Sequence, residues 1–155
     1  MRGVFLALEK ENKFEYYFKP EKIIDEIKWT ELKIQQLHEQ GMNNEFFSIS
    51  FHNYQIAGQF FTLKNNKSKK HLIGFLLNEN TNPILYRSLI NSLISFVNSL
   101  IITNEDAIFE EILEDLTKLI EKQCTTITVN NHKKKLCIEN KKTLYETLRE
   151  NLWAF

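Results

Sequence analysis

The residues best suited to chemistry lie near the C-terminus, where Cys124, His132 and Cys137 form a C-x7-H-x4-C pattern. Thiolate and imidazole groups bind zinc, but a structural zinc site needs four ligands and a fixed spacing. A nucleophilic cysteine needs a neighbouring base, and no known signature surrounds either cysteine. We therefore predict no metal, no cofactor and no catalytic residue, with Cys124 and Cys137 as ordinary half-buried thiols.

Glycine and histidine give no second chemical pattern. The four glycines stand singly at positions 3, 41, 58 and 74, so the sequence has neither a phosphate-binding P-loop nor a dinucleotide fingerprint. The other histidines, His38, His52 and His71, fall on different predicted elements. The sequence therefore predicts a protein that is not an enzyme.

Charge argues against a general affinity for nucleic acid. The 20 basic side chains balance 20 acidic ones, and 17 of the basic residues are lysines, which do not supply the bidentate contacts of arginine. Two segments are locally basic, a loop predicted at Lys64–His71 and the run Lys133–Lys135. They could bind phosphates or anionic lipid, but we favour a solubilising role at sheet edges.

The elements that must position these residues fit one domain, because 155 residues of ordinary globular composition bury a single core. Alternating or continuous apolar patterns predict strands at residues 3–8, 14–18, 46–52, 55–63 and 72–77. A helix is predicted from Pro20 to Gly41. The strand at 72–77 is apolar on both faces and should be central.

The C-terminal half is predicted to be mostly helical. Apolar residues at helical spacing indicate helices at 84–102 and from a weak capping box at Thr103 to about Gln123. Short strands are expected at 125–129 and 136–138, followed by a last helix at 142–152. The segment at 84–102 carries too many polar residues to span a membrane, so no transmembrane segment is predicted.

One face of the helix at 84–102 is unusual, because it is small and uncharged where a solvated face usually carries Lys and Glu. We predict that this face is partly covered and contributes to a partner interface. Its candidate interface residues are Ser88, Asn91, Ser92, Ser95 and Asn98.

A second candidate interface comes from Trp29 and Leu32, which lie opposite the apolar stripe of the helix predicted at 20–41. Three interpretations stay open. The chain's own C-terminal residues, including Trp153 and Phe155, could cover them, a partner protein could do so, or a break near Trp29 could reset the phase of the helix.

The order strand, strand, helix, three strands and two helices predicts an α+β fold, a five-stranded antiparallel sheet with helices packed on its faces. With Val4–Leu8 followed by Phe14–Pro20, this order resembles the longin (SNARE-like) domain, a relative of the roadblock domain. The likeness covers about residues 2–123, and residues 124–155 form a C-terminal extension. It implies a binding platform for small GTPases, their exchange factors or trafficking complexes, often through pairing of two such domains.

We therefore expect a cytoplasmic, non-enzymatic adaptor that binds a small GTPase or a second longin or roadblock chain, with a homodimer as one form. Membrane contact would be peripheral and through partners, and no nucleic acid is expected. Two alternatives stay open: a profilin-like actin-binding module, and a small cysteine- or metal-dependent hydrolase. Two cysteines and no signal peptide favour a reducing compartment.

Overall fold

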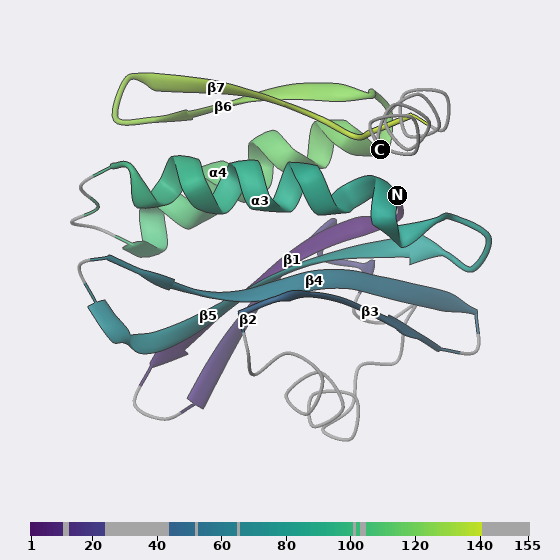
Figure 1. Cartoon of the computed structure of the whole chain (residues 1–155), viewed down its shortest axis with the longest axis horizontal. Coiled ribbons are helices and arrows are strands. Elements are labelled where there is room, and N and C mark those ends of the chain that lie inside the picture. Colours follow the sequence, from purple (N-terminus) through teal and green to yellow (C-terminus); the bar gives the residue numbers. More distant parts are fainter. Residues whose placement is uncertain are drawn as a thin grey trace, which may run out of the picture.

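The computed structural model of the chain describes residues 1–10, 13–23, 44–51, 53–64, 66–100, 102 and 105–140. The two longest helices in these ranges lie above a broad sheet, with a small hairpin above them (Figure 1). The strands are β1 (Gly3–Lys10), β2 (Lys13–Lys19), β3 (Phe46–Ser50), β4 (Tyr54–Leu63), β5 (Asn66–Asn78), β6 (Cys124–Val129) and β7 (His132–Cys137). The helices are the 3-10 turn η1 (Pro83–Tyr86), α3 (Arg87–Asn98), α4 (Glu105–Thr117) and the 3-10 turn η2 (Lys118–Ile120).

The main sheet has five strands in the order β2-β1-β5-β4-β3, and every neighbouring pair is antiparallel. The predicted α+β class and five-stranded antiparallel sheet are therefore confirmed. β5 occupies the middle position, as the two-sided apolar run Leu72–Leu77 predicted, because a central strand is covered on both faces.

A row of aromatic residues and glycines crosses this sheet. Phe5 pairs with Gly74, and Gly74 pairs with Gly58. Phe18 and Phe47 extend the row at the two edges. A Cβ on Gly74 would lie 2.3 Å from the Phe5 ring, so the glycine makes the space that the ring fills.

Both α3 and α4 pack on one face of the sheet. Their buried residues, including Leu89, Leu93, Ile112 and Leu116, join one apolar cluster with Leu6 and other strand residues. The helices arise from the expected amphipathic stripes, although the first turn of the segment at 84–102 is 3-10 and α4 also ends in a 3-10 turn. Helical packing is thus confirmed for this face.

The opposite face carries a second apolar cluster, which includes Phe5, Ile56, Leu76 and Ile23. Pro20 is not the first helical residue as predicted: it forms a bend, and its carbonyl accepts a hydrogen bond from the Ile23 amide at 3.0 Å. The rest of that predicted helix lies outside the described residues. The predicted last helix at 142–152 lies outside them too.

The predicted loop at Lys64–His71 is wrong. Asn66–His71 is the first half of β5, and it pairs with the end of β4 through Phe61 and Leu63. Its polar residues form a strand because this part of the sheet is half-exposed and needs no continuous apolar face.

Candidate interaction groove

The short extension strands form a hairpin that covers the helices. β6 and β7 pair from Cys124–Cys137 to Val129–His132 around Asn130 and Asn131, both of which have positive φ. Such angles suit a two-residue hairpin turn, which asparagine adopts readily. The side of the hairpin that faces the helices is buried, and it carries Thr125, Ile127, Val129 and Leu136. β6 and β7 therefore form a third layer over α3 and α4 (Figure 1).

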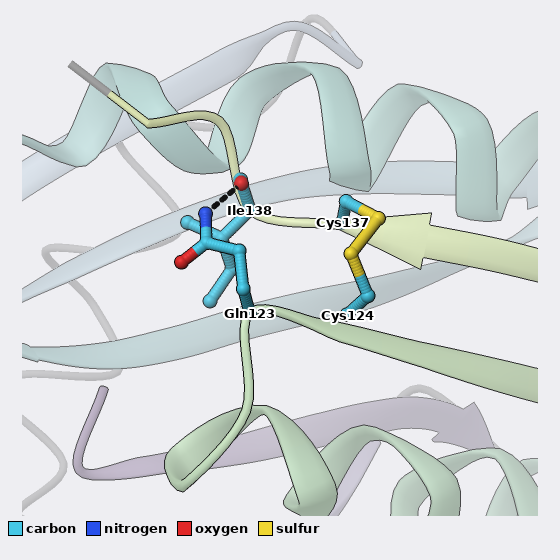
Figure 2. The surroundings of a disulfide bond; sticks show 4 residues. All are labelled: Gln123, Cys124, Cys137 and Ile138. Carbon is cyan, nitrogen blue, oxygen red and sulfur yellow. Dashed lines mark hydrogen bonds between the residues drawn. A yellow bond between two sulfur atoms is a disulfide. The ribbon is translucent and has the colours of Figure 1, made fainter. Parts of the chain in front are cut away.

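The prediction of two free thiols is wrong, because Cys124 and Cys137 form a disulfide. The two residues are paired across the hairpin with Cα atoms 4.1 Å apart, which brings their side chains together. In the next pair, the Ile138 backbone amide donates to the Gln123 carbonyl at 2.9 Å, and the side-chain Nε2 of Gln123 donates to the Ile138 carbonyl (Figure 2). This end of the hairpin is therefore fixed covalently and by hydrogen bonds.

The structure does not assemble Cys124, His132 and Cys137 into one site. His132 pairs with Val129 at the turn, the opposite end of the hairpin from the disulfide. Within the described ranges, no three His, Cys, Asp or Glu side chains gather where they could hold a metal ion. The oxidised cysteines also offer no thiolate as a nucleophile or ligand.

The predicted Ser/Asn face of α3 borders a groove beside β7, and four of its five residues, Ser88, Asn91, Ser92 and Ser95, line this groove. Ser88 and Ser92 line one hollow of about 580 Å³ with Lys135 and Cys137. A second hollow of about 400 Å³ shares Ser92 and lies against Lys134. Its other lining residues are Asn91, Ser95, Phe96 and Ser99. We call these two hollows together the α3–β7 groove.

The remaining candidates differ in position. The Asn98 side chain is half-buried and accepts a hydrogen bond from the Lys64 amide at 3.2 Å, so it links α3 to the end of β4. Trp29, Leu32, Trp153 and Phe155, as well as His38 and His52, lie outside the described residues. The sequence analysis missed the part of β7 in this groove, because it assigned Lys133–Lys135 to a loop.

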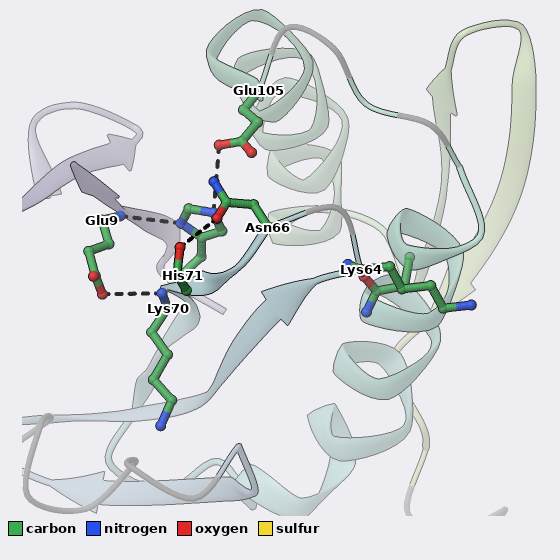
Figure 3. A network of polar contacts seen from close by, with 8 residues as sticks. Glu9, Lys64, Asn66, Lys70, His71 and Glu105 are labelled. Carbon is green, nitrogen blue, oxygen red and sulfur yellow. Dashed lines mark hydrogen bonds and ion pairs between the residues drawn. The ribbon is translucent and has the colours of Figure 1, made fainter. Parts of the chain in front are cut away.

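His71 forms a separate, buried polar centre at the junction of β1, β5 and α4 (Figure 3). Its Nδ1 accepts a hydrogen bond from the Glu9 amide at 3.2 Å, and the Lys70 amide donates to the Glu9 carboxylate at 3.1 Å. His71 Nε2 lies 3.7 Å from the Glu105 carboxylate, longer than a hydrogen bond. Burial lowers the pKa of His71, although the Glu105 and Glu9 carboxylates act in the opposite direction.

This arrangement favours a neutral imidazole. Because Nδ1 accepts a hydrogen bond, the ring proton resides on Nε2, which faces Glu105. The Phe61 and Phe109 rings lie 5.7 and 5.9 Å from the imidazole, centre to centre, and enclose it. We interpret His71 as a structural link between the strands and α4.

No family model matches the chain, and no curated protein matches it. Within the described residues, no helix is long and apolar enough to cross a bilayer.

Proposed function

We propose that the chain is a longin-like adaptor, a non-enzymatic protein-binding subunit of a small-GTPase or membrane-trafficking complex. The observation that carries this proposal is the arrangement of the antiparallel sheet. Two strands precede residues 24–43, three strands follow them, and two helices then pack on one face. This order matches the one on which the resemblance depends, except that the helix expected between the second and third strands lies outside the described residues. A fold by itself gives only an associational argument for function.

The α3–β7 groove supports a binding role. Its α3 side consists mostly of small polar residues, with Leu89 and Phe96 among them, and Ser88, Asn91 and Ser95 are exposed. The proposed partner is a small GTPase or a second longin or roadblock chain, including another copy of this protein. Membrane contact would come through such partners.

A cytoplasmic location is part of this proposal, and the disulfide makes it testable. Disulfides are rare in a reducing cytoplasm, so most of the Cys124–Cys137 pair should be reduced there. Rapid alkylation of thiols in intact cells, followed by mass spectrometry of the hairpin peptides, measures the reduced fraction. A fully oxidised pair in cells would contradict the proposed location.

Affinity capture from native lysate tests the proposed role. The tagged chain is incubated with excess GDP in one sample and a non-hydrolysable GTP analogue in the other, and bound proteins are identified by mass spectrometry. Enrichment of a small GTPase in one nucleotide state, or of a longin or roadblock chain, supports the adaptor role. Recovery of actin instead, confirmed by co-sedimentation, would replace it with the profilin-like alternative.

A further inference from the structure

The two outer edges of the β6–β7 hairpin differ in what they contact. On β6, the Thr128 amide points away from β7 and donates to the Asp115 carboxylate of α4 at 3.2 Å. Thr125 donates from its hydroxyl to the Asp115 carbonyl at 2.8 Å. The edge of β6 is therefore attached to α4.

The edge of β7 faces the groove. Ile138 and Gln123 form a hydrogen-bonded pair, and such pairs alternate along an antiparallel ladder. The amides and carbonyls of Lys133, Lys135 and Cys137 therefore point away from β6. The Glu139 amide points in the same direction and donates to the Leu85 carbonyl of η1 at 3.1 Å. The outward amides and carbonyls of β7 therefore lie on the side of the hairpin where η1 and α3 run.

The α3–β7 groove along the edge of β7 is long enough for a short extended peptide. The residues of α3 and its C-cap along the groove run from Ser88 to Ser99, a distance of about 16 Å at the rise of an α-helix. About five residues of extended chain cover the same distance. Lys133–Cys137 offers an edge of this length, with one end at the disulfide and the other near the hairpin turn.

The charge of β7 indicates which kind of peptide segment would bind there. Lys133, Lys134 and Lys135 are all exposed. The strand alternation places the side chain of Lys134 on the α3 side and the other two on the outer face. Glu139 is the one acidic residue among the described residues that line the groove. Lysines discourage pairing of this edge with a second copy of itself, because like charges would meet, whereas they attract an acidic strand.

We propose that the outer edge of β7, which pairs with no strand other than β6 in the described part of the chain, and the Ser/Asn face of α3 bind an extended acidic peptide segment of a partner protein. The segment adds a third strand to the hairpin through main-chain hydrogen bonds, and its carboxylates meet Lys133, Lys134 and Lys135. This inference rests on the protein-binding role proposed above and names the chemistry of the partner.

The first test is a titration of the full, oxidised chain into a fluorescein-labelled peptide of alternating Glu and Val, about seven residues long, followed by fluorescence anisotropy. We expect saturable binding that weakens with added salt. The double variant K134E/K135E should bind about tenfold more weakly, and the control K22E, an exposed lysine beyond β2, should bind like the wild type. Equal binding by K134E/K135E and the wild type would overturn the proposal.

The second test separates strand addition from charge attraction alone. The same peptide, N-methylated at alternate residues in either register, keeps its charge but lacks one set of amide donors, so at least one register should lose binding. In the wild-type protein, peptide should slow hydrogen exchange of the Lys133, Lys135 and Cys137 amides. Binding of both methylated peptides without such protection would overturn strand addition.

The outcomes also distinguish this inference from the adaptor role. If affinity capture recovers a small GTPase but the peptide does not bind, only the acidic-segment proposal fails. If phosphatidylserine vesicles bind the chain and the peptide does not, the lysines of β7 serve a membrane surface and the proposal is wrong.

Discussion

Gly74 lies directly opposite Phe5 in the β1–β5 ladder, and the Phe5 ring occupies the space where a Cβ on Gly74 would lie. We predict that Gly74→Ala destabilises the protein by about 1–3 kcal/mol, because the added methyl group overpacks the sheet face. Urea unfolding of both proteins measures the difference. The double variant Gly74→Ala/Phe5→Leu should recover part of the lost stability, because leucine has no ring at this position. An unchanged unfolding midpoint for Gly74→Ala would contradict the prediction that the added methyl group overpacks this face.

The buried His71 should make stability depend on pH. Its pKa is lowered in the folded state by burial, so below about pH 6.5 the unfolded chain binds a proton that the folded chain resists. The His71 contribution to the free energy of unfolding is therefore present at higher pH. This contribution is lost as pH falls from the pKa of His71 in the unfolded chain toward its lower pKa in the folded protein.

His71→Gln provides the comparison for this pH effect, because glutamine does not titrate. The charged groups facing His71, namely Glu9, Glu105 and Lys69, are kept in both proteins. We expect the stability advantage of the wild type to shrink between about pH 7.5 and 5.5 in urea unfolding series. An advantage that stays constant or grows as pH falls would show that the folded pKa is not lowered.

The disulfide should stabilise the hairpin by restricting the unfolded chain. Cys124 and Cys137 are separated by 13 positions, and closure of a loop of this size contributes about 2–4 kcal/mol. The double variant Cys124→Ser/Cys137→Ser should therefore unfold at lower urea concentration. Reduced wild-type protein serves as the control and should unfold near the variant. Identical midpoints for the oxidised and reduced wild type would contradict this prediction.

Asp115 should hold β6 on α4. Asp115→Ala removes the acceptor of the Thr128 amide, and we expect a loss of about 1 kcal/mol together with faster hydrogen exchange at that amide. Lys118→Ala is the matched control, because it removes the lysine that pairs with the same carboxylate at 3.4 Å and leaves in place the Asp115 oxygen that accepts from the Thr128 amide. If the Thr128 amide exchanged equally fast in both variants, the loss of the Asp115–Lys118 ion pair would explain the effect, and the prediction would be wrong.

Local patterns in the sequence were sufficient for most of the described sheet and helices. Leu72–Leu77 revealed the central strand because burial on both faces leaves no polar position, and α3 followed from its apolar stripe. The first half of β5 was missed because a half-exposed strand of Asn, Lys and Ser residues has the composition of a loop.

The groove was only half predictable for a similar reason. The Ser/Asn face was visible from helical spacing, but β7 was not, because Lys133–Lys135 has no apolar alternation. A turn centred on Asn130 and Asn131 would have set the register and placed Cys124 opposite Cys137. The pairing of two cysteines depends on that register, which their separation alone does not specify.

The position of the hairpin also predicts an order of unfolding. β6 and β7 form the outermost layer, so detaching them exposes Ile127, Val129 and Leu136 and the apolar surface of α3 and α4 while the sheet remains beneath. Such a partly opened state would expose an apolar, aggregation-prone surface on an otherwise folded molecule. Reduction of the Cys124–Cys137 bond would raise the population of this state, so solubility under reducing conditions depends on how firmly the hairpin is held.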